Sequence, residues 1–429
     1  MPFPLYLDTA RLGPFNKKAQ AAHTAFLRLA GELPTARSLI PFLRDGAAAW
    51  HDPVGIVERE LTQWQGIRSL ERSLAGPYGA TKNSRVYLAS RSTTLVRLGI
   101  EQLFKHCRRC LTVDLSWPSY LLDLEHIARR RGGEIVVASI KEAVFHKQKG
   151  IADICELVYR QYTENRCDGL FLPVVDHLGI RIPVVQIVET LRNRGCEIRF
   201  VMLDASQAYT HVSMADDIAV ANLAVAGTHK WLGSYFPLGV AISPKISSSY
   251  AFDATISNAR QQCLLDDSLL TFVEQINGND SPRSETVNLG PLFSAFGAIS
   301  DGRPAIEDSL RNRIANADIV SQLAIDAGWR SVRPSKEFRT GILLLEPPKS
   351  WVCSNSIAKF EQRFLDESVY VTIYDSGLVR LAMPCEPLTQ SELDRMSRVF
   401  AVSRPQATPP LNLIREGNPT YQLDCLHAS

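Results

Sequence analysis

The chain lacks any long hydrophobic run. Its 429 residues contain no apolar stretch approaching the ~18 residues that a membrane-spanning helix needs, so we expect no membrane-embedded segment. The opening MPFPLYLDTARLG has no basic stretch followed by an apolar one, and so does not resemble a secretory signal. A strong net charge is also missing, because 47 Lys and Arg residues face 45 Asp and Glu residues. The resulting formal charge of +2 gives no reason to expect binding to nucleic acid or to a membrane surface.

Cysteines are few, and they suggest no disulfide framework. The nine cysteines are odd in number and scattered along the chain, which favours a reducing compartment. We therefore expect a cytoplasmic protein. Cys107 and Cys110 have the CxxC spacing of zinc and redox sites, but no second CxxC is present to complete a zinc site. We accordingly expect no metal.

What the chain does have is a regular alternation of strand-like and helix-like segments from residue 84 onward. Helical patterns separate most of the apolar runs, which lie at 85–90, 110–116, 134–140, 169–175, 198–206, 222–227 and 238–243. This alternation predicts an α/β fold, in which a mainly parallel sheet of the seven-stranded type is sandwiched by helices.

The pattern changes toward the C-terminus. Helix-like stretches at 309–328 and 389–403, the second with Thr389 as N-cap, flank strand-like runs at 340–348 and 370–384. We therefore predict four parts of the chain. They are an N-terminal segment (1–45) that packs with the small domain, a large domain (46–300), a smaller α+β domain (301–403) and a polar, Pro-rich tail (404–429).

Reactive side chains follow several of the predicted strands. Ligands of parallel sheets bind beyond the carboxyl ends of the strands. There, Asp204 ends the apolar run FVML, where a carboxylate is costly unless it is paired, and Lys230 follows another apolar strand. Hydroxyl residues at 90–94 open a helix, which is a ready anion site, and Trp117 offers a flat surface. An acid, an amine, an anion cradle and a stacking surface are the four groups that pyridoxal 5′-phosphate needs.

These residues resemble those of a known family. The stretch LDASQAYTHV, followed by GTHKWLGS, is similar to the Asp-x-x-Gln and Ser-x-His-Lys signatures of fold-type I pyridoxal-phosphate enzymes. The closest group is aminotransferase class V, which includes cysteine desulfurases, kynureninase and isopenicillin N epimerase-like proteins. Further matches follow the family's order along most of the chain: LYLDTARLG, SRSTTLVRLG, VVDHLGIRIPVVQI, SETVNLGPLFSAFGAI and GLVRLAMPCEPLTQSELDRM. The resemblance implies the fold-type I pyridoxal-phosphate transferase fold and a homodimer with active sites at the subunit interface.

The resemblance also implies a role for each matching residue. Lys230 would be the catalytic lysine that forms a Schiff base with the cofactor, and Asp204 would pair with its pyridine nitrogen. Gln207 and His229 would contact its phenolic oxygen and its phosphate. The other cofactor-binding residues would be Thr93 and Thr94 (phosphate), Trp117 (ring stacking), Asp176, and Thr286 (phosphate of the other subunit's cofactor). Substrate would be bound by Arg380, which suits a carboxylate, with Arg11 and Arg91 as further candidates.

Two departures from the family pattern bear on the chemistry. Asp176 stands where many members have Asn, and a carboxylate there either alters the cofactor's proton distribution or is itself protonated. The desulfurases carry a nucleophilic Cys shortly before the carboxylate-binding arginine, whereas residues 363–380 contain none. Cys353 lies further back, and Cys385 follows Arg380. A persulfide mechanism is therefore disfavoured.

The strand-end residues leave the type of reaction open. We rank first an aminotransferase acting on an α-amino acid or a conjugate of one. A C–S lyase or other β-lyase comes second. An epimerase and a catalytically silent binding protein of the same fold are further alternatives. The side chain of the substrate is not readable from this sequence.

Overall fold

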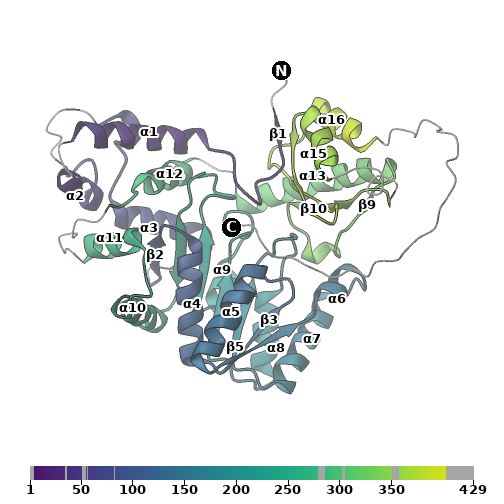
Figure 1. The fold of residues 1–429 in the computed structure, drawn as a ribbon, viewed down its shortest axis with the longest axis horizontal. Coiled ribbons are helices and arrows are strands. Elements are labelled where there is room, and N and C mark those ends of the chain that lie inside the picture. Colours follow the sequence, from purple (N-terminus) through teal and green to yellow (C-terminus); the bar gives the residue numbers. More distant parts are fainter. Residues whose placement is uncertain are drawn as a thin grey trace, which may run out of the picture.

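A seven-stranded sheet forms the centre of the larger of two bodies in the computed structural model (Figure 1). The structure describes residues 4–33, 36–50, 55, 57–81, 83–278, 286–301, 305–349 and 357–401. In spatial order, the strands are β2 (Arg85–Ala89), β8 (Gly239–Ser243), β7 (Leu223–Gly227), β6 (Phe200–Asp204), β5 (Gly169–Pro173), β3 (Arg109–Val113) and β4 (Glu134–Ala138).

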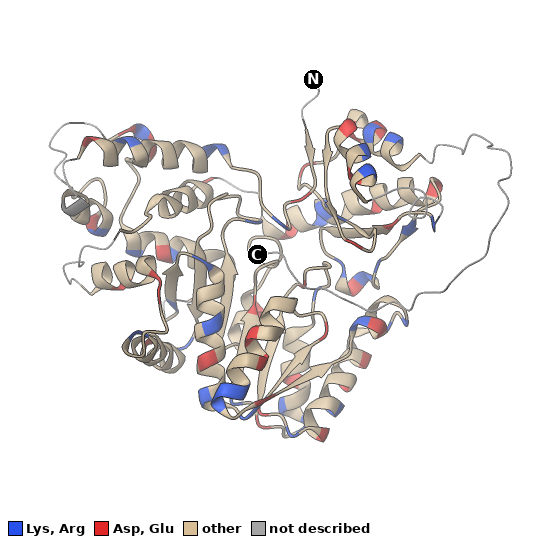
Figure 2. Cartoon of the chain, viewed as in Figure 1, with Lys and Arg blue, Asp and Glu red and all other residues tan. Residues whose placement is uncertain are grey.

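The sheet is mainly parallel. Neighbours from β7 to β4 pair in parallel, whereas β8 runs antiparallel to both β2 and β7. Every residue of β5, β6, β7 and β8 is buried, which explains why these strands read as continuous apolar runs. Figure 2 accordingly shows charged residues mainly on the helices and loops around the central strands. The predicted fold class is confirmed.

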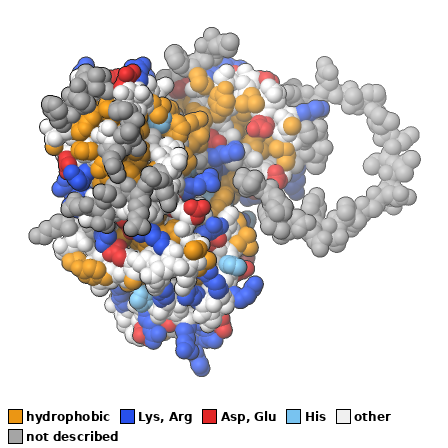
Figure 3. Space-filling view, turned by 60° about the vertical axis from the view of Figure 1, so that its left-hand side comes forward, with side chains coloured by type: hydrophobic (Ala, Val, Ile, Leu, Met, Phe, Trp, Pro, Cys, Tyr) orange, Lys and Arg blue, Asp and Glu red, His pale blue; other side chains and the backbone are white. Residues whose placement is uncertain are grey.

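Helices cover both faces of this sheet (Figure 1). They are α3 (Ile67–Ala75), α4 (Ser92–His106), α5 (Pro118–Arg131), α6 (Lys141–Phe145), α7 (Ile151–Glu164), α8 (Val184–Asn193), α9 (Ala215–Val220), α10 (Ile246–Gln261), α11 (Ser268–Asn277) and α12 (Gly290–Ile299). Among the described helices, none combines the length and hydropathy needed to cross a bilayer. Figure 3 shows hydrophobic side chains interspersed with both kinds of charged side chain on one face of the molecule.

The second body has its own sheet and core. Its strands lie in the order β12 (Thr372–Ile373), β13 (Val379–Ala382), β10 (Ile342–Glu346) and β9 (Arg330–Ser331), with antiparallel neighbours. Its helices are α13 (Ile306–Asp326), α15 (Ile357–Asp366) and α16 (Gln390–Phe400). Thr389 caps α16 in a capping box with Glu392, so the predicted N-cap is confirmed.

The N-terminal segment contacts both bodies. Strand β1 (Leu5–Tyr6) pairs with β11 (Val369–Tyr370), and Leu5 and Leu7 belong to the core of the second body. In contrast, α1 (Lys17–Glu32) packs on α12, where a Cβ on Gly297 would lie 2.3 Å from the Lys18 carbonyl oxygen. Helix α2 (Ala36–Asp45) contacts α3 and α11. Our expectation placed 1–45 with the small domain, and it did not include these contacts with the larger body. The domain boundaries stay predictions, and the tail 404–429 lies outside the described residues.

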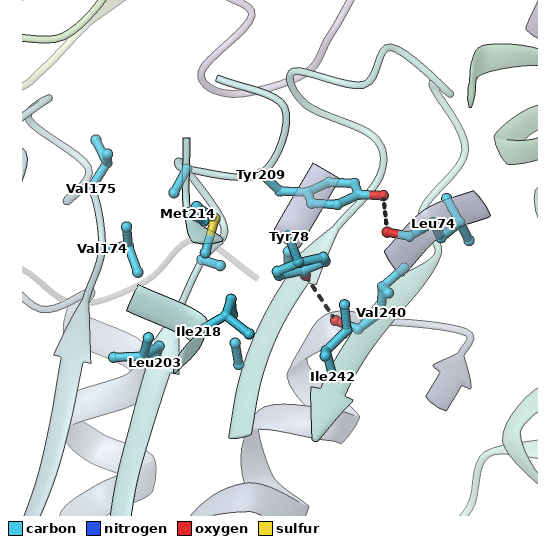
Figure 4. Close-up of a cluster of buried hydrophobic side chains, with 14 of the residues drawn as sticks. Leu74, Tyr78, Val174, Val175, Leu203, Tyr209, Met214, Ile218, Val240 and Ile242 are labelled. Atoms are coloured by element: carbon cyan, nitrogen blue, oxygen red, sulfur yellow. Dashed lines mark hydrogen bonds between the residues drawn. The ribbon is translucent and has the colours of Figure 1, made fainter. Parts of the chain in front are cut away.

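A dense core lies beneath the carboxyl ends of the strands (Figure 4). The rings of Tyr78 and Tyr209 are 4.7 Å apart between centroids, and the Tyr209 hydroxyl donates to the Leu74 carbonyl at 2.9 Å. Leu203 belongs to the same core and immediately precedes Asp204. Because close-packed interiors resist deformation, this core holds the strand ends, and the side chains beyond them, in fixed positions.

Candidate active site

A cavity of about 390 Å³ lies at the carboxyl ends of β5, β6 and β7. Most of the residues predicted from the sequence line it: Arg11, Arg91, Thr93, Trp117, Asp176, Asp204, Gln207, His229, Lys230 and Arg380. The wall also includes Ala10, Ser92, Tyr120, Pro173, Val175, His177, Ser206 and Pro237. Segments far apart in the sequence thus meet where the fold rule places a ligand.

Two predicted residues lie elsewhere. Thr94 lines a separate pocket of about 500 Å³ on the outer side of α4, together with Arg97 and Leu98. One step along a helix turns a side chain by ~100°, so Thr93 faces the cavity and Thr94 does not. The side chain of Thr94 thus lies outside the cavity wall, and the expectation that Thr94 binds the cofactor stays a prediction. Thr286 is exposed and is not part of the cavity wall of its own chain. Its expected contact with a partner subunit's cofactor stays a prediction.

The backbone around Lys230 is held tightly. The amide of Gly13 donates to the His229 carbonyl at 2.7 Å, and the amide of Gly233 donates to the Lys230 carbonyl at 2.9 Å. A Cβ on Gly13 would lie 1.9 Å from the Lys230 carbonyl oxygen, so only glycine allows this approach. The N-terminal segment is therefore pressed against the loop that carries the lysine.

The amine of Lys230 is easier to deprotonate than an ordinary lysine. Burial, assisted by the positive charge of Arg380, lowers the pKa of Lys230 from 10.5 to about 8, against an opposing effect of Asp204. A neutral amine is the nucleophilic form. The site thus provides a lysine that can attack a carbonyl compound near neutral pH.

Asp204 lies next to Lys230 because their strands are neighbours. Asp204 ends β6 opposite Val225 of β7, and Lys230 follows β7. The Asp204 side chain is 6% exposed, and its Oδ1 accepts a hydrogen bond from the Ser206 amide at 2.9 Å. Burial raises the pKa of Asp204, while Ser206 and Lys230 lower it. An ionised Asp204 is therefore favoured by a cation held against it inside the cavity.

One end of the cavity suits an anion. Helix α4 begins here without a side-chain cap, so the amides of its first turn have no intrahelical partner. At this end the backbone of Arg91 and Ser92 lies against Gly239. The contact is possible because glycine has no side chain, since a Cβ at position 239 would lie 2.6 Å from the Ser92 nitrogen. Burial, with the charges of Lys230 and Arg91, lowers the pKa of His229 to about 4, so its imidazole is neutral. These groups suit a phosphate.

An aromatic wall forms one side of the cavity. Trp117 precedes α5 and remains 44% exposed, so it does not fill the core. The ring of His177 meets it edge-on, at 5.3 Å between centroids. Burial and the charge of Arg380 lower the pKa of His177 to about 4. Sequence reasoning gave no role to His177 or Tyr120, although both lie within the stretches that follow strands.

Another part of the cavity wall is built around Arg380 of β13. Its side chain is buried, and it donates from Nη1 to the His177 carbonyl and from Nη2 to Thr372 Oγ1, each at 3.1 Å. Asp8 Oδ1 lies 3.5 Å from Nη2 and also accepts a hydrogen bond from Thr372. Asp8, which sequence reasoning missed, thus holds the guanidinium in place and balances part of its charge. No sequence pattern pointed to Asp8, because its place beside Arg380 depends on the pairing of β1 with β11.

Asp176 is a buried carboxyl group with one unused oxygen. Its Oδ1 accepts from the amides of Leu178 and Ile180, at 3.1 and 2.6 Å. Its Oδ2 has no hydrogen-bond partner among the described residues. Burial raises the pKa of Asp176 to about 7, so a large share of the group is protonated at neutral pH. It can therefore donate or accept a hydrogen bond toward a ligand.

Unpaired polar atoms are concentrated at this cavity. Within the described part of the chain, five of its lining residues contribute buried polar atoms without a hydrogen-bond partner: Asp176 Oδ2, His177 Nδ1, Ser206 Oγ, His229 Nδ1 and Arg380 Nε. Such atoms are rare in folded proteins because each costs free energy. The cavity is therefore suited to a ligand with several polar groups.

Solved structures show the same fold. The complex of the cystine C–S lyase C-DES with its reaction product cysteine persulfide matches with a TM-score of 0.66 and 12% identity, over 93% of this chain and 97% of that chain. Alanine–glyoxylate aminotransferase from Nostoc sp. matches with a TM-score of 0.63 and 13% identity, over 93% of this chain and 96% of that chain. The cysteine desulfurase CsdA from Escherichia coli matches with a TM-score of 0.62 and 12% identity, over 92% of this chain and 93% of that chain. No protein-family model matches the sequence, and neither does any curated protein. At these identities the likeness shows the fold, and function must be argued from the site.

Proposed function

We propose that this protein binds pyridoxal 5′-phosphate through Lys230 and transforms an α-amino acid or a conjugate of one. The observation that carries the proposal is the convergence of Lys230 and Asp204, from neighbouring strands, in one cavity with an anion-binding end and unpaired polar atoms. The solved structures of the same fold support it, since one contains a C-DES mutant with glycine covalently linked to its pyridoxal-phosphate cofactor.

The residues fit the cofactor group by group. The first turn of α4, with Ser92 and Thr93, would hold the phosphate, and His229 and Arg91 lie at the same end. Asp204 would face the ring nitrogen, and Trp117 would cover one face of the ring. Asp176 would lie near the ring's polar edge. When bound, the cofactor supplies an aldehyde for amines and an electron sink for charge at the substrate's Cα.

Each of the cavity's main residues then has a separate role in the reaction. Lys230, with its lowered pKa, supplies a neutral amine and afterwards a base that accepts or returns a proton at Cα. Arg380 orients the substrate carboxylate, and its free Nε leaves a donor available for that contact. Asp204 would stabilise a protonated ring nitrogen on the bound cofactor. Trp117 limits water on the face that it covers.

Among the reactions open to such a site, we propose transamination first. No described cysteine lines the cavity, so the described residues supply no thiol that would compete with the amine of Lys230. That absence within the described residues disfavours a persulfide on the protein. It leaves a C–S lyase as the second candidate, which the similarity to the C-DES complex favours.

We also propose a homodimeric, cytoplasmic protein. Thr286 is exposed in the segment that leads into α12, where the cofactor of a second subunit would lie against it. Equilibrium sedimentation tests for the homodimer. A monomer at working concentration would contradict it.

Absorbance spectroscopy tests the core of the function. The purified protein, mixed with pyridoxal 5′-phosphate, is expected to develop a visible band that borohydride fixes on Lys230. A protein that stays colourless contradicts the proposal and supports a silent binding protein.

A panel of amino acids then separates the reactions. A lasting shift to the pyridoxamine form indicates transamination, whereas release of 2-oxo acid and ammonia with recovery of the original band indicates elimination.

A further inference from the structure

Two arginines of the cavity wall have no acidic partner. Arg11 and Arg91 line the cavity, and both are exposed. Within the described part of the chain, neither guanidinium has an ion-pair or hydrogen-bond partner, whereas the guanidinium of Arg380 has Asp8 at 3.5 Å. The cavity therefore has two positive charges that no described residue offsets by direct contact.

Arg91 belongs to the end of the cavity that suits a phosphate. It directly precedes the first turn of α4, and its charge helps to lower the pKa of His229. A phosphate bound there would supply the negative charge that Arg91 lacks. Arg11 comes instead from the N-terminal segment, so a different anion has to be considered for it.

The backbone around Arg11 runs between the two groups that would bind the substrate's amine and carboxylate. Three residues before it, Asp8 contacts Arg380, and the Asp8 carbonyl accepts from the amide of Arg11 at 2.9 Å. Two residues after it, Gly13 lies against the carbonyl of Lys230. An amino acid held at its amine by Lys230 and at its carboxylate by Arg380 would lie along this segment. Its side chain is then the group left for Arg11 to bind.

The charge of the whole wall also favours a further anion. The wall has four Arg or Lys side chains and only two acidic ones, Asp176 and Asp204. Burial raises the pKa of both acids, to about 7 for Asp176, so a large share of Asp176 is uncharged at neutral pH. A second carboxylate on the substrate therefore meets more attraction than repulsion in this cavity.

We propose that Arg11 binds a carboxylate at the end of the substrate's side chain, so that the substrate is an acidic α-amino acid. The inference rests on the proposed function and names the substrate class for the same cavity. A guanidinium matches a carboxylate with two parallel N–H···O hydrogen bonds. A side-chain amide of the same shape has one acceptor and an NH₂ group, and the NH₂ group faces a side chain that can only donate. Glutamine and asparagine should therefore react more slowly than glutamate and aspartate.

The test uses pairs of amino acids that share a shape and differ in charge. The holoenzyme is mixed with glutamate or glutamine, and with aspartate or asparagine, and the rate of the cofactor's absorbance change is measured for each. The ratio of the acid's rate to the amide's rate within a pair is compared between variants, because a general loss of reactivity cancels in it. We expect a ratio of at least about tenfold in the pair whose length suits Arg11.

Substitutions of Arg11 should change this ratio in a graded way. Arg11→Lys keeps the charge and loses the planar fork, so it should retain part of the preference. Arg11→Met should bring the ratio close to one, and the reversed charge of Arg11→Glu should lower it further. Arg129→Met is the matched control, because Arg129 of α5 is also exposed and without an ion-pair partner among the described residues, but lies outside the cavity wall. It should leave the ratio and the rates unchanged.

Three results would overturn the inference and leave the proposed function standing. The first is a ratio near one in both pairs for the unmodified protein. The second is an unchanged ratio in Arg11→Met, which would mean that Arg11 serves another anion, such as the cofactor's phosphate or an acidic group of a second subunit. The third is a holoenzyme that reacts with other amino acids of the panel and with none of these four.

The remaining outcomes are also decisive. If Arg11→Met does not fold, Arg11→Lys decides, because a lowered ratio supports the inference and an unchanged one contradicts it. If the unmodified protein gives no visible band with pyridoxal 5′-phosphate, the proposed function fails, and this inference fails with it.

Discussion

The lowered pKa of Lys230 predicts how fast the apoprotein captures its cofactor at each pH. Only the neutral amine attacks an aldehyde. With a pKa of about 8, about 10% of Lys230 is neutral at pH 7, compared with about 0.03% for a lysine at its ordinary 10.5. The capture rate at pH 7 should therefore exceed that of an ordinary alkylamine by about 300-fold on this ground alone. It should rise with pH and level off above about 8.

Two substitutions should move this midpoint in opposite directions. Asp204 stabilises the protonated lysine and Arg380 disfavours it. Asp204→Asn should therefore lower the midpoint, and Arg380→Gln should raise it. Each single-charge removal has a matched control in the exposed ion pair of Arg109 and Glu134, which lies at the amino ends of β3 and β4. Arg109→Gln and Glu134→Gln should leave the midpoint unchanged.

Stopped-flow absorbance of the apoprotein with excess pyridoxal 5′-phosphate provides the assay. Rates are divided by those of a free alkylamine at the same pH, expressed per neutral amine, so that ionisation of the cofactor itself cancels and the pH dependence of Lys230 remains. A midpoint near 10 for the unmodified chain would refute the reasoning, because it would mean that burial does not perturb Lys230. Shifts of the same sign in Asp204→Asn and Arg380→Gln would refute the assignment of their charges to this amine.

Four further substitutions test other parts of the structure. Lys230→Ala should abolish the visible band with unchanged circular dichroism, and a retained band would show that the lysine is wrongly assigned. Asp176→Asn should become more stable relative to the unmodified apoprotein as pH rises. The pKa of Asp176 is about 7 in the folded chain and 3.8 in the unfolded chain, so the folded chain keeps a proton that the unfolded chain releases. The unmodified protein therefore loses stability as the pH rises from 3.8 to about 7, and the Asn variant does not. Urea unfolding should show a gain approaching about 4 kcal/mol at most by pH 8, and a pH-independent difference would contradict this. Asp8→Asn should raise the KM for amino acids by about tenfold, with kcat less affected, by loosening Arg380; an unchanged KM would argue against that contact. Thr389→Ala should cost about 1 kcal/mol in unfolding free energy through loss of the α16 cap, and no loss would mean that the cap is not needed.

Local patterns were sufficient for much of the fold. The central strands are buried on both faces, so each had to be a continuous apolar run, and each is bounded by a change to helical periodicity. The cap at Thr389 depends on residues three positions apart and was equally readable. Such features are encoded within a few residues, and a single sequence displays them directly.

The candidate site was predictable to the extent that it follows strand ends. Asp204 and Lys230 could be chosen because a charged group after an apolar strand must meet either solvent or a ligand, and parallel strands bring such groups to one edge. His177 could be located in the same way, but no pattern in the sequence gave it a role. The side chain of Thr94 lies outside the cavity because adjacent residues at a helix start point in different directions, which a motif does not show.

The amino-acid sequence alone therefore determined the α/β class, the strands of the large sheet and the pair formed by Asp204 and Lys230, since all of these follow from the order of apolar and polar residues along short segments. Only the tertiary structure decided the contact of Asp8 with Arg380 and the hydrogen bond from Trp231 to Gln207. These contacts join residues far apart in the chain, and they depend on side-chain packing between two bodies that no local period records.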